Sequence, residues 1–108
     1  MSETGVRLVF CTVPDREVGQ RIARTLVAES LAACVNVVPG LHSVYRWQGA
    51  VESADEALLL AKTTRERLDA LRERLVALHP YELPEVIAVD VAAGLPAYLD
   101  WVVAGTRG

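Results

Sequence analysis

Residues Ala33–Thr63, ACVNVVPGLHSVYRWQGAVESADEALLLAKT, predict two long β-strands folded back on each other. The first arm is rich in valine and alternates in character over 43–47, while the second arm ends in the apolar run 57–61. A turn is expected at Gln48-Gly49, and Pro39-Gly40 predicts a bend or bulge, because proline cannot donate to a ladder. Each arm exceeds the roughly five or six residues usual for a strand, so the hairpin is expected to project from the domain.

The residues before this hairpin predict a strand followed by a helix. Val6–Thr12 is a run of strand formers that ends before Pro14. Asp15 can accept hydrogen bonds from free amides at a helix start. Apolar residues then recur every fourth position up to about Ser30, which is typical of a helix with one buried face.

The residues after the hairpin predict a helix, a strand and a closing helix. Thr63 and Glu66 have the spacing of a capping box, and leucines then mark one helical face until Pro80. Glu85–Val91 is expected to be a fourth strand. Pro96 suits the first turn of the last helix, which is expected to end near Gly105. This helix is expected to bury Tyr98, Trp101 and Val102.

The predicted order, β-α-β-β-α-β-α, indicates an α+β fold of the ferredoxin-like, split β-α-β sandwich type, in a single domain over residues 1–108. Both main helices should cover one face of an antiparallel sheet. The strands are nevertheless apolar on both sides, as in Leu58-Leu59-Leu60, so a second cover is needed. The chain has no spare element large enough to cover this face, so another copy of the same sheet is the expected cover. The sequence therefore predicts a homo-oligomer.

The charge and the hydrophobic content of the chain indicate which kinds of partner it can bind. The net charge is −3 and no basic cluster occurs, which argues against nucleic acid or an anionic membrane as the main partner. Hydrophobic residues make up 52% of the chain, which is high for a small monomer and again favours association. The start, Met1-Ser2-Glu3-Thr4, is polar and shows no secretory signal, so a cytoplasmic protein is expected.

Five segments together resemble the CutA divalent-cation tolerance proteins, over nearly the whole chain. They are Phe10–Asp15 (FCTVPD), Leu31–Asn36 (LAACVN), Tyr45–Gly49 (YRWQG), Lys62–Thr64 (KTT) and His79–Glu85 (HPYELPE). The resemblance implies a ferredoxin-like homotrimer, similar in plan to the PII signalling proteins, whose hairpins wrap neighbouring subunits. It also implies a role in tolerance of divalent metal ions, copper among them, through weak metal binding.

A metal site proposed in a bacterial relative carries over to Cys11, Leu78 and His79, so this chain has leucine where that site has a histidine. Copper or another divalent metal is therefore an expected ligand at Cys11 and His79, but not an obligatory cofactor. A core position for Cys11 and a helix C-cap for His79 are the alternatives. The sequence shows no recognisable catalytic set, so no enzymatic activity is expected.

A polar cluster is also expected where the hairpin meets the loop after Pro80. Its members are Trp47, Glu56, Lys62, Tyr81, Glu82 and Glu85. One cation, several acids and aromatic walls at a subunit boundary suit a small polar ligand or a hydrated metal. The alternative is a set of interfacial salt bridges. A PII-like trimer that binds a small ligand, with Lys62 as its charge, and a structural or partner-binding scaffold therefore stay open beside the metal hypothesis.

Overall fold

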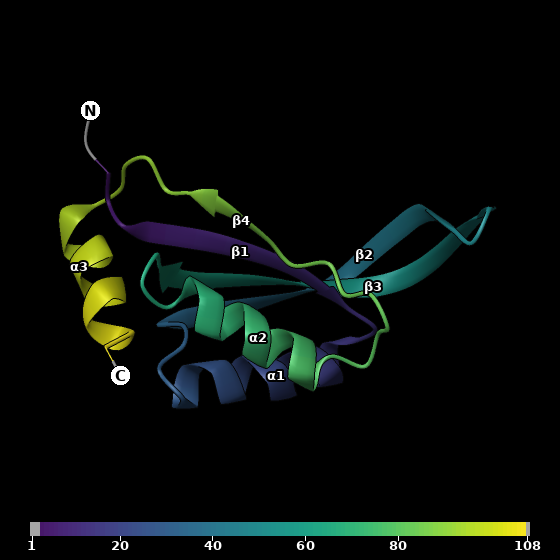
Figure 1. The fold of residues 1–108 in the computed structure, drawn as a ribbon, viewed down its shortest axis with the longest axis horizontal. Helices are drawn as coiled ribbons and strands as arrows, with labels where there is room; N and C mark the ends of the chain where they lie inside the picture. Colours follow the sequence, from purple (N-terminus) through teal and green to yellow (C-terminus); the bar gives the residue numbers. More distant parts are fainter. Residues whose placement is uncertain (1–2, 108) are drawn as a thin grey trace.

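Seven elements follow one another along residues 3–107, the part of the chain that the computed structural model describes (Figure 1). In order they are β1 (Val6–Val13), α1 (Arg16–Ala28), β2 (Cys34–Trp47), β3 (Ala50–Thr64), α2 (Leu68–Leu78), β4 (Ile87–Asp90) and α3 (Pro96–Gly105). The predicted order is confirmed. Residues 1, 2 and 108 belong to the expected domain but lie outside the described residues. The first two residues of the expected polar start are therefore not described.

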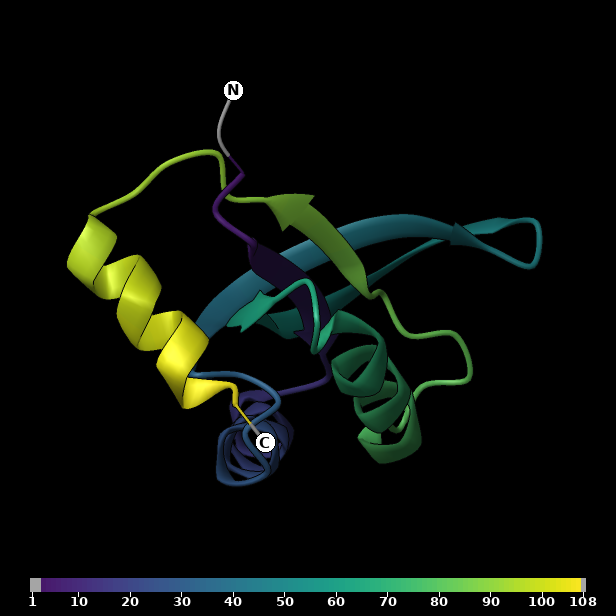
Figure 2. The same ribbon diagram turned by 60° about the vertical axis from the view of Figure 1, so that its left-hand side comes forward.

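The sheet has the strand order β2-β3-β1-β4, and every neighbouring pair is antiparallel. Helices α1 and α2 lie on one face of this sheet, as Figures 1 and 2 show from two directions. The α+β ferredoxin-like architecture predicted from the sequence is therefore confirmed. Strand β4 is shorter than the expected Glu85–Val91, although the Val91 amide still donates to the carbonyl of Val6.

The core lies between the sheet and these two helices. Val9, Cys11 and Val13 alternate along β1 and are at most 1% exposed. Leu71 and Leu75 of α2 pack into the same core, so the predicted leucine face is confirmed. At the start of α1, the Asp15 carboxylate accepts a 2.8 Å hydrogen bond from the Val18 amide, which is the predicted cap.

The predicted capping box at the start of α2 is wrong. Thr63 and Thr64 still belong to β3, and α2 begins only at Leu68, without a side-chain cap. The Thr63 hydroxyl donates instead to the carbonyl of Leu31, at 2.6 Å and fully buried. That buried partner holds Thr63 in the strand, because leaving the Leu31 carbonyl without a donor would be costly.

The long hairpin is confirmed, with 14 residues in β2 and 15 in β3. Its turn is Gln48-Gly49, and both residues have positive φ values, of 50° and 84°. Positive φ at both central residues is the pattern of the type I′ turn, whose twist matches that of antiparallel strands. The predicted bulge also occurs, between Val38 and Leu41. In Figure 1 the paired arms reach well beyond the helices.

Helix α3 has proline in its first turn and ends at Gly105, as predicted. It packs on β1 and β3, where Val102 is fully buried. The expected burial of Tyr98 and Trp101 is wrong for the single chain, because they are 41% and 51% exposed. Their rings stack on each other, at 5.5 Å between centroids.

Much of the sheet face opposite α1 and α2 has no cover within the described chain. Leu8, Phe10 and Leu60 are only partly buried there, and Ile87 and Val89 of β4 are 55% and 46% exposed. Apolar patches of this kind mark surfaces of association. The two-sided apolar character read from the sequence is thus present in the fold, and the homotrimer that would cover it stays a prediction.

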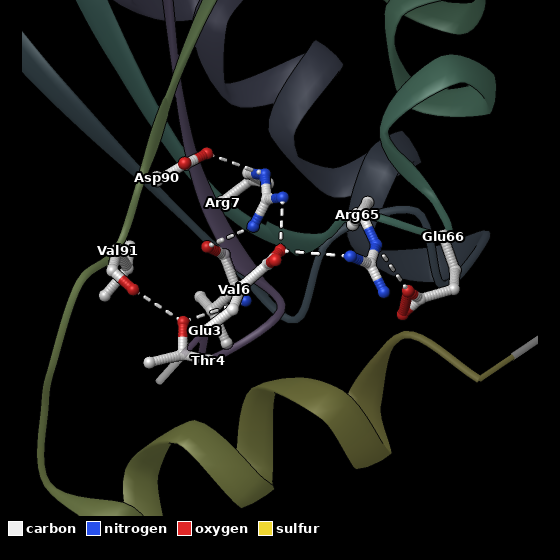
Figure 3. Close-up of polar contacts among 8 residues, drawn as sticks. All are labelled: Glu3, Thr4, Val6, Arg7, Arg65, Glu66, Asp90 and Val91. Atoms are coloured by element: carbon white, nitrogen blue, oxygen red, sulfur yellow. Dashed lines mark hydrogen bonds and ion pairs between the residues drawn. The ribbon is translucent and has the colours of Figure 1, made fainter. Parts of the chain in front are cut away.

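Polar contacts fasten the start of β1 to β4 and to the end of β3 (Figure 3). The guanidinium of Arg7, whose side chain is only 11% exposed, lies 2.7 Å from Glu3 and 3.0 Å from Asp90. Glu3 also pairs with Arg65, and the Thr4 hydroxyl donates to the carbonyl of Val91. The hydrogen bond from Arg7, assisted by the charge of Arg65, lowers the pKa of Glu3.

Within residues 3–107, none of the three helices combines the length and the apolar character that crossing a membrane requires.

Candidate functional site

A cleft of about 870 Å³ lies between the outer half of the hairpin and the loop that follows α2. Five of the six residues expected to form a polar cluster line it together. They are Trp47, Glu56, Tyr81, Glu82 and Glu85. Tyr45 and Glu52 also line it, and we call this seven-residue site the acidic cleft. Its volume falls in the usual range of small-molecule sites.

The bulge in β2 decides which side chains face the acidic cleft. Inside the bulge Val38 pairs with Leu58, whereas outside it Leu41 pairs with Glu56, so β2 has one residue more than β3. Side chains alternate between faces along a strand. The odd-numbered residues of outer β2, Tyr45 and Trp47, therefore share a face with the even-numbered residues of β3.

If the alternation of inner β2 continued through Pro39-Gly40 without a bulge, that face would carry Val44 and Arg46 instead. The bulge thus places aromatic rings in the cleft and turns the Arg46 side chain to the other face. An aromatic and acidic wall results from a local irregularity of the backbone.

Glu56 is the most enclosed acid of the cleft, with 9% of its surface exposed. One carboxylate oxygen accepts a 2.7 Å hydrogen bond from the phenol of Tyr81. In the described part of the chain, no lysine, arginine or histidine lies within 4.0 Å of this carboxylate. Burial, then the hydrogen bond to Glu56 and its negative charge, raise the pKa of Tyr81 well above its ordinary range.

His79 ends α2 and fixes the loop that carries Tyr81. Its Nε2 lies 2.7 Å from the carbonyl oxygen of Thr12, and its Nδ1 lies 3.1 Å from the amide nitrogen of Tyr81. These contacts require Nε2–H to donate and Nδ1 to accept, which is one tautomer of the neutral ring. The imidazole also packs against the Tyr81 ring, at 4.7 Å between centroids.

Cys11 lies on the helix-covered side of β1 and is 1% exposed. Burial, assisted by the negative charges of Glu85 and Glu56, raises the pKa of its thiol from 9.0 to about 12. A protonated thiol is a poor ligand, because metals bind the thiolate. Both nitrogens of His79 are already engaged, and Leu78 packs against the core. Cys11 and His79 therefore offer no free donor pair in this conformation.

No cluster of three or more histidine, cysteine, aspartate or glutamate side chains arranged to hold a metal occurs in residues 3–107. The four glutamates of the acidic cleft line a shared space without converging on one point. Such a wall suits a cation that keeps its own water shell better than one that is stripped of it.

Lys62 lies apart from the acidic cleft within one chain. It is six residues from Glu56 along β3, which is about 20 Å of extended strand. Its ammonium group donates to the side-chain oxygen of Asn36 and lies 3.8 Å from the sulfur of Cys34. These groups occupy the open face of the sheet near α3.

Two residues of the cleft, Tyr45 and Glu52, were not predicted from the sequence. The signal that identifies them is the bulge, since Pro39-Gly40 marks it in the sequence. Shifting the strand alternation by one residue beyond Gly40 brings Tyr45, Trp47 and the glutamates to one face.

Both the sequence and the structure of this chain match known proteins over most of its length. Residues 7–105 match the family described as CutA1 divalent ion tolerance protein. The divalent-cation tolerance protein CutA of Thermus thermophilus is 55% identical over 95 residues, covering 88% of this chain and 92% of that protein. The chloroplastic protein CutA of Arabidopsis thaliana is 48% identical over 93% of this chain, which spans only 55% of that longer protein.

Solved structures agree with the sequence matches. The crystal structure of CutA from Xylella fastidiosa superposes with a TM-score of 0.93 at 50% identity, covering 95% of this chain and 99% of that one. The similarity therefore extends over the helices, the sheet and the projecting hairpin.

Proposed function

Because this chain belongs to the CutA1 divalent ion tolerance protein family, we propose that it acts in divalent metal tolerance as a cytoplasmic homotrimer that binds metal ions weakly, copper among them. The two cysteines are free thiols, which fits a reducing compartment. No catalytic step is proposed. The thiol of Cys11 and the phenol of Tyr81 both have raised pKa values, which makes them poor nucleophiles at neutral pH.

The apolar face opposite α1 and α2 supports the assembly. Phe10 and Leu60 are neighbours across β1 and β3 on this face and are only partly buried. Burying such a face between copies is favourable by about 25 cal/mol per Å² of apolar surface. Sedimentation equilibrium should give three chains per particle, and Leu60→Asp should lower that number. A wild-type protein that stays monomeric at micromolar concentration would contradict the trimer.

The buried carboxylate of Glu56 is the observation that carries metal binding. It faces the acidic cleft, where three further glutamates line the same space, and no lysine, arginine or histidine among residues 3–107 forms an ion pair with it. A buried charge is costly unless it is compensated, so a cation entering the cleft is stabilised. A hydrated divalent ion held by several dispersed carboxylates, rather than by a closed ligand set, binds weakly.

The experiment compares two locations for the metal. Mn²⁺, followed by electron paramagnetic resonance, and Cu²⁺, against a competing chelator, are titrated into wild-type protein, Glu56→Gln, and the Cys11→Ala/His79→Ala double variant. We expect Glu56→Gln to weaken Mn²⁺ binding at least fivefold. Copper affinity that falls in the double variant would support the Cys11 and His79 site, which then requires the imidazole to leave Thr12. Affinities unchanged in all variants would contradict metal binding at either location.

A further inference from the structure

The acidic cleft combines negative charge with aromatic walls. Four glutamates line it, and so do the rings of Tyr45, Trp47 and Tyr81. Among the residues 3–107, the lining includes no lysine, arginine or histidine. An anionic ligand would therefore meet only repulsion from the side chains of this chain.

Aromatic walls distinguish between kinds of cation. A hydrated divalent metal ion keeps its water and gains little from a ring. An alkylammonium ion is weakly hydrated along its methylene chain, can pack that chain on indole and phenol rings, and is attracted by the negative ring faces. Carboxylates beside aromatic rings are thus matched to an organic ammonium ion.

Glu56 supplies the anchoring point. It is nine-tenths buried, one oxygen is held by Tyr81, and no cation of the described chain compensates it. An ammonium group entering from the cleft would form a charge-assisted hydrogen bond with this carboxylate. The exposed glutamates Glu82 and Glu85 are available for a second ammonium group at the mouth of the same cleft.

We propose that the acidic cleft is a binding site for a small aliphatic diamine, with one ammonium group on Glu56 and the methylene chain against Trp47 and Tyr45. The proposal concerns the same cleft as the proposed function but a different ligand, and it does not require metal binding. It also differs from the small ligand expected to pair with the charge of Lys62, since Lys62 does not line the cleft within one chain.

The test uses 1,4-diaminobutane as the probe and Trp47 as the reporter. The chain has two tryptophans, so Trp101→Phe leaves Trp47 as the only indole. Titration of this variant at low ionic strength should give a saturable change in fluorescence, with one diamine per chain. The neutral 1,4-butanediol and the anionic succinate have the same four-carbon length and should give no saturable signal.

Two substitutions locate the site by calorimetry. Glu56→Gln should weaken diamine binding at least tenfold, because it removes the charge and keeps the shape. Trp47→Leu should weaken diamine binding about tenfold and leave Mn²⁺ affinity unchanged, because cation–π attraction is lost only for the organic ion. Lys62→Ala is the matched control, and it should leave diamine affinity unchanged.

The cationic group could also come from an arginine or lysine of a second copy of this chain. In that case the diamine does not bind the assembled protein, and Glu56→Gln lowers the oligomeric state in sedimentation. That result overturns the diamine proposal, as does diamine binding that is equal in wild type and Glu56→Gln. Wild-type protein that binds the diamine but no Mn²⁺ would contradict the metal proposal and leave this one standing.

Discussion

The phenol of Tyr81 and the carboxylate of Glu56 are 2.7 Å apart, although the two residues are 25 positions apart in sequence. This contact fastens the loop after α2 to the base of the projecting arm of β3. It also satisfies one oxygen of a carboxylate that is nine-tenths buried. The contact therefore supports both the local fold and the charge of the acidic cleft.

Tyr81→Phe is expected to destabilise the protein by about 1.5–3 kcal/mol, because the buried carboxylate loses its donor. Urea denaturation at fixed protein concentration measures the change. Glu56→Leu, which has no acceptor for the phenol, and the double variant complete a cycle, in which the two effects should not add. Strict additivity would show that the hydrogen bond contributes no free energy of its own.

Substitution of His79 by phenylalanine should destabilise the fold by about 2–4 kcal/mol, since the Thr12 carbonyl and the Tyr81 amide both lose their partner. His42 is the matched control. Its side chain is 59% exposed and, within the described part of the chain, its one side-chain partner is the exposed Asp55. His42→Phe should change the free energy of unfolding by less than about 0.5 kcal/mol, and an equal effect of both substitutions would contradict the role of His79.

The Cys11 thiol predicts a loss of stability in alkali. Its pKa is about 12 in the folded protein and 9.0 ordinarily, so above pH 9 the unfolded chain releases this proton while the folded chain retains it. The contribution is fully present below pH 9 and is lost as the pH rises toward 12. Between pH 8 and pH 10, wild type should lose about 1 kcal/mol more than Cys11→Ala.

Cys34→Ala is the control for that experiment, because it removes a sulfur and leaves Cys11 in place. It should keep the wild-type pH dependence. Stopping at pH 10 limits the contribution of Tyr81, whose pKa is also raised. Parallel pH profiles for wild type and Cys11→Ala would refute the assignment.

The hairpin turn requires glycine at position 49, where φ is 84°. Gly49→Ala should cost about 1 kcal/mol, because a Cβ atom is disfavoured in the left-handed region. The exposed turn has open space around this position, so conformational strain and not a clash causes the effect. Gly49→Asn should cost less than half as much in thermal denaturation, since asparagine tolerates positive φ, and equal costs would argue against backbone strain.

The sequence predicts the fold well because its signals are local. Asp15 caps its helix, Gln48-Gly49 turns the hairpin, and the leucines of α2 repeat at helical spacing. The capping box failed for a non-local reason: Thr63 has its partner 32 residues away, in the carbonyl of Leu31. A sequence pattern shows which partners are near along the chain, and a buried long-range acceptor can outweigh them.

The candidate site was predicted only in part. Tyr81, Glu82 and Glu85 lie in one short loop, so their proximity follows from the sequence. Lys62 was grouped with them by its charge, but strand geometry separates it from Glu56 along β3. Tyr45 and Glu52, which were not predicted, lie beyond the bulge. There, an alternation counted from the inner part of β2 assigns each side chain of that strand to the wrong face.

The bulge has a consequence for how this site could diverge. The two-residue turn sets the register of the outer arms, in which Tyr45 lies opposite Glu52 and Trp47 lies opposite Ala50. Deleting Gly40 would therefore remove the bulge and leave these pairs, and the face that they share, unchanged. A change of one residue in chain length near Gly40 is absorbed where the strand bends, so the aromatic and acidic wall is insulated from insertions and deletions there, and substitutions within the wall itself are its route of change.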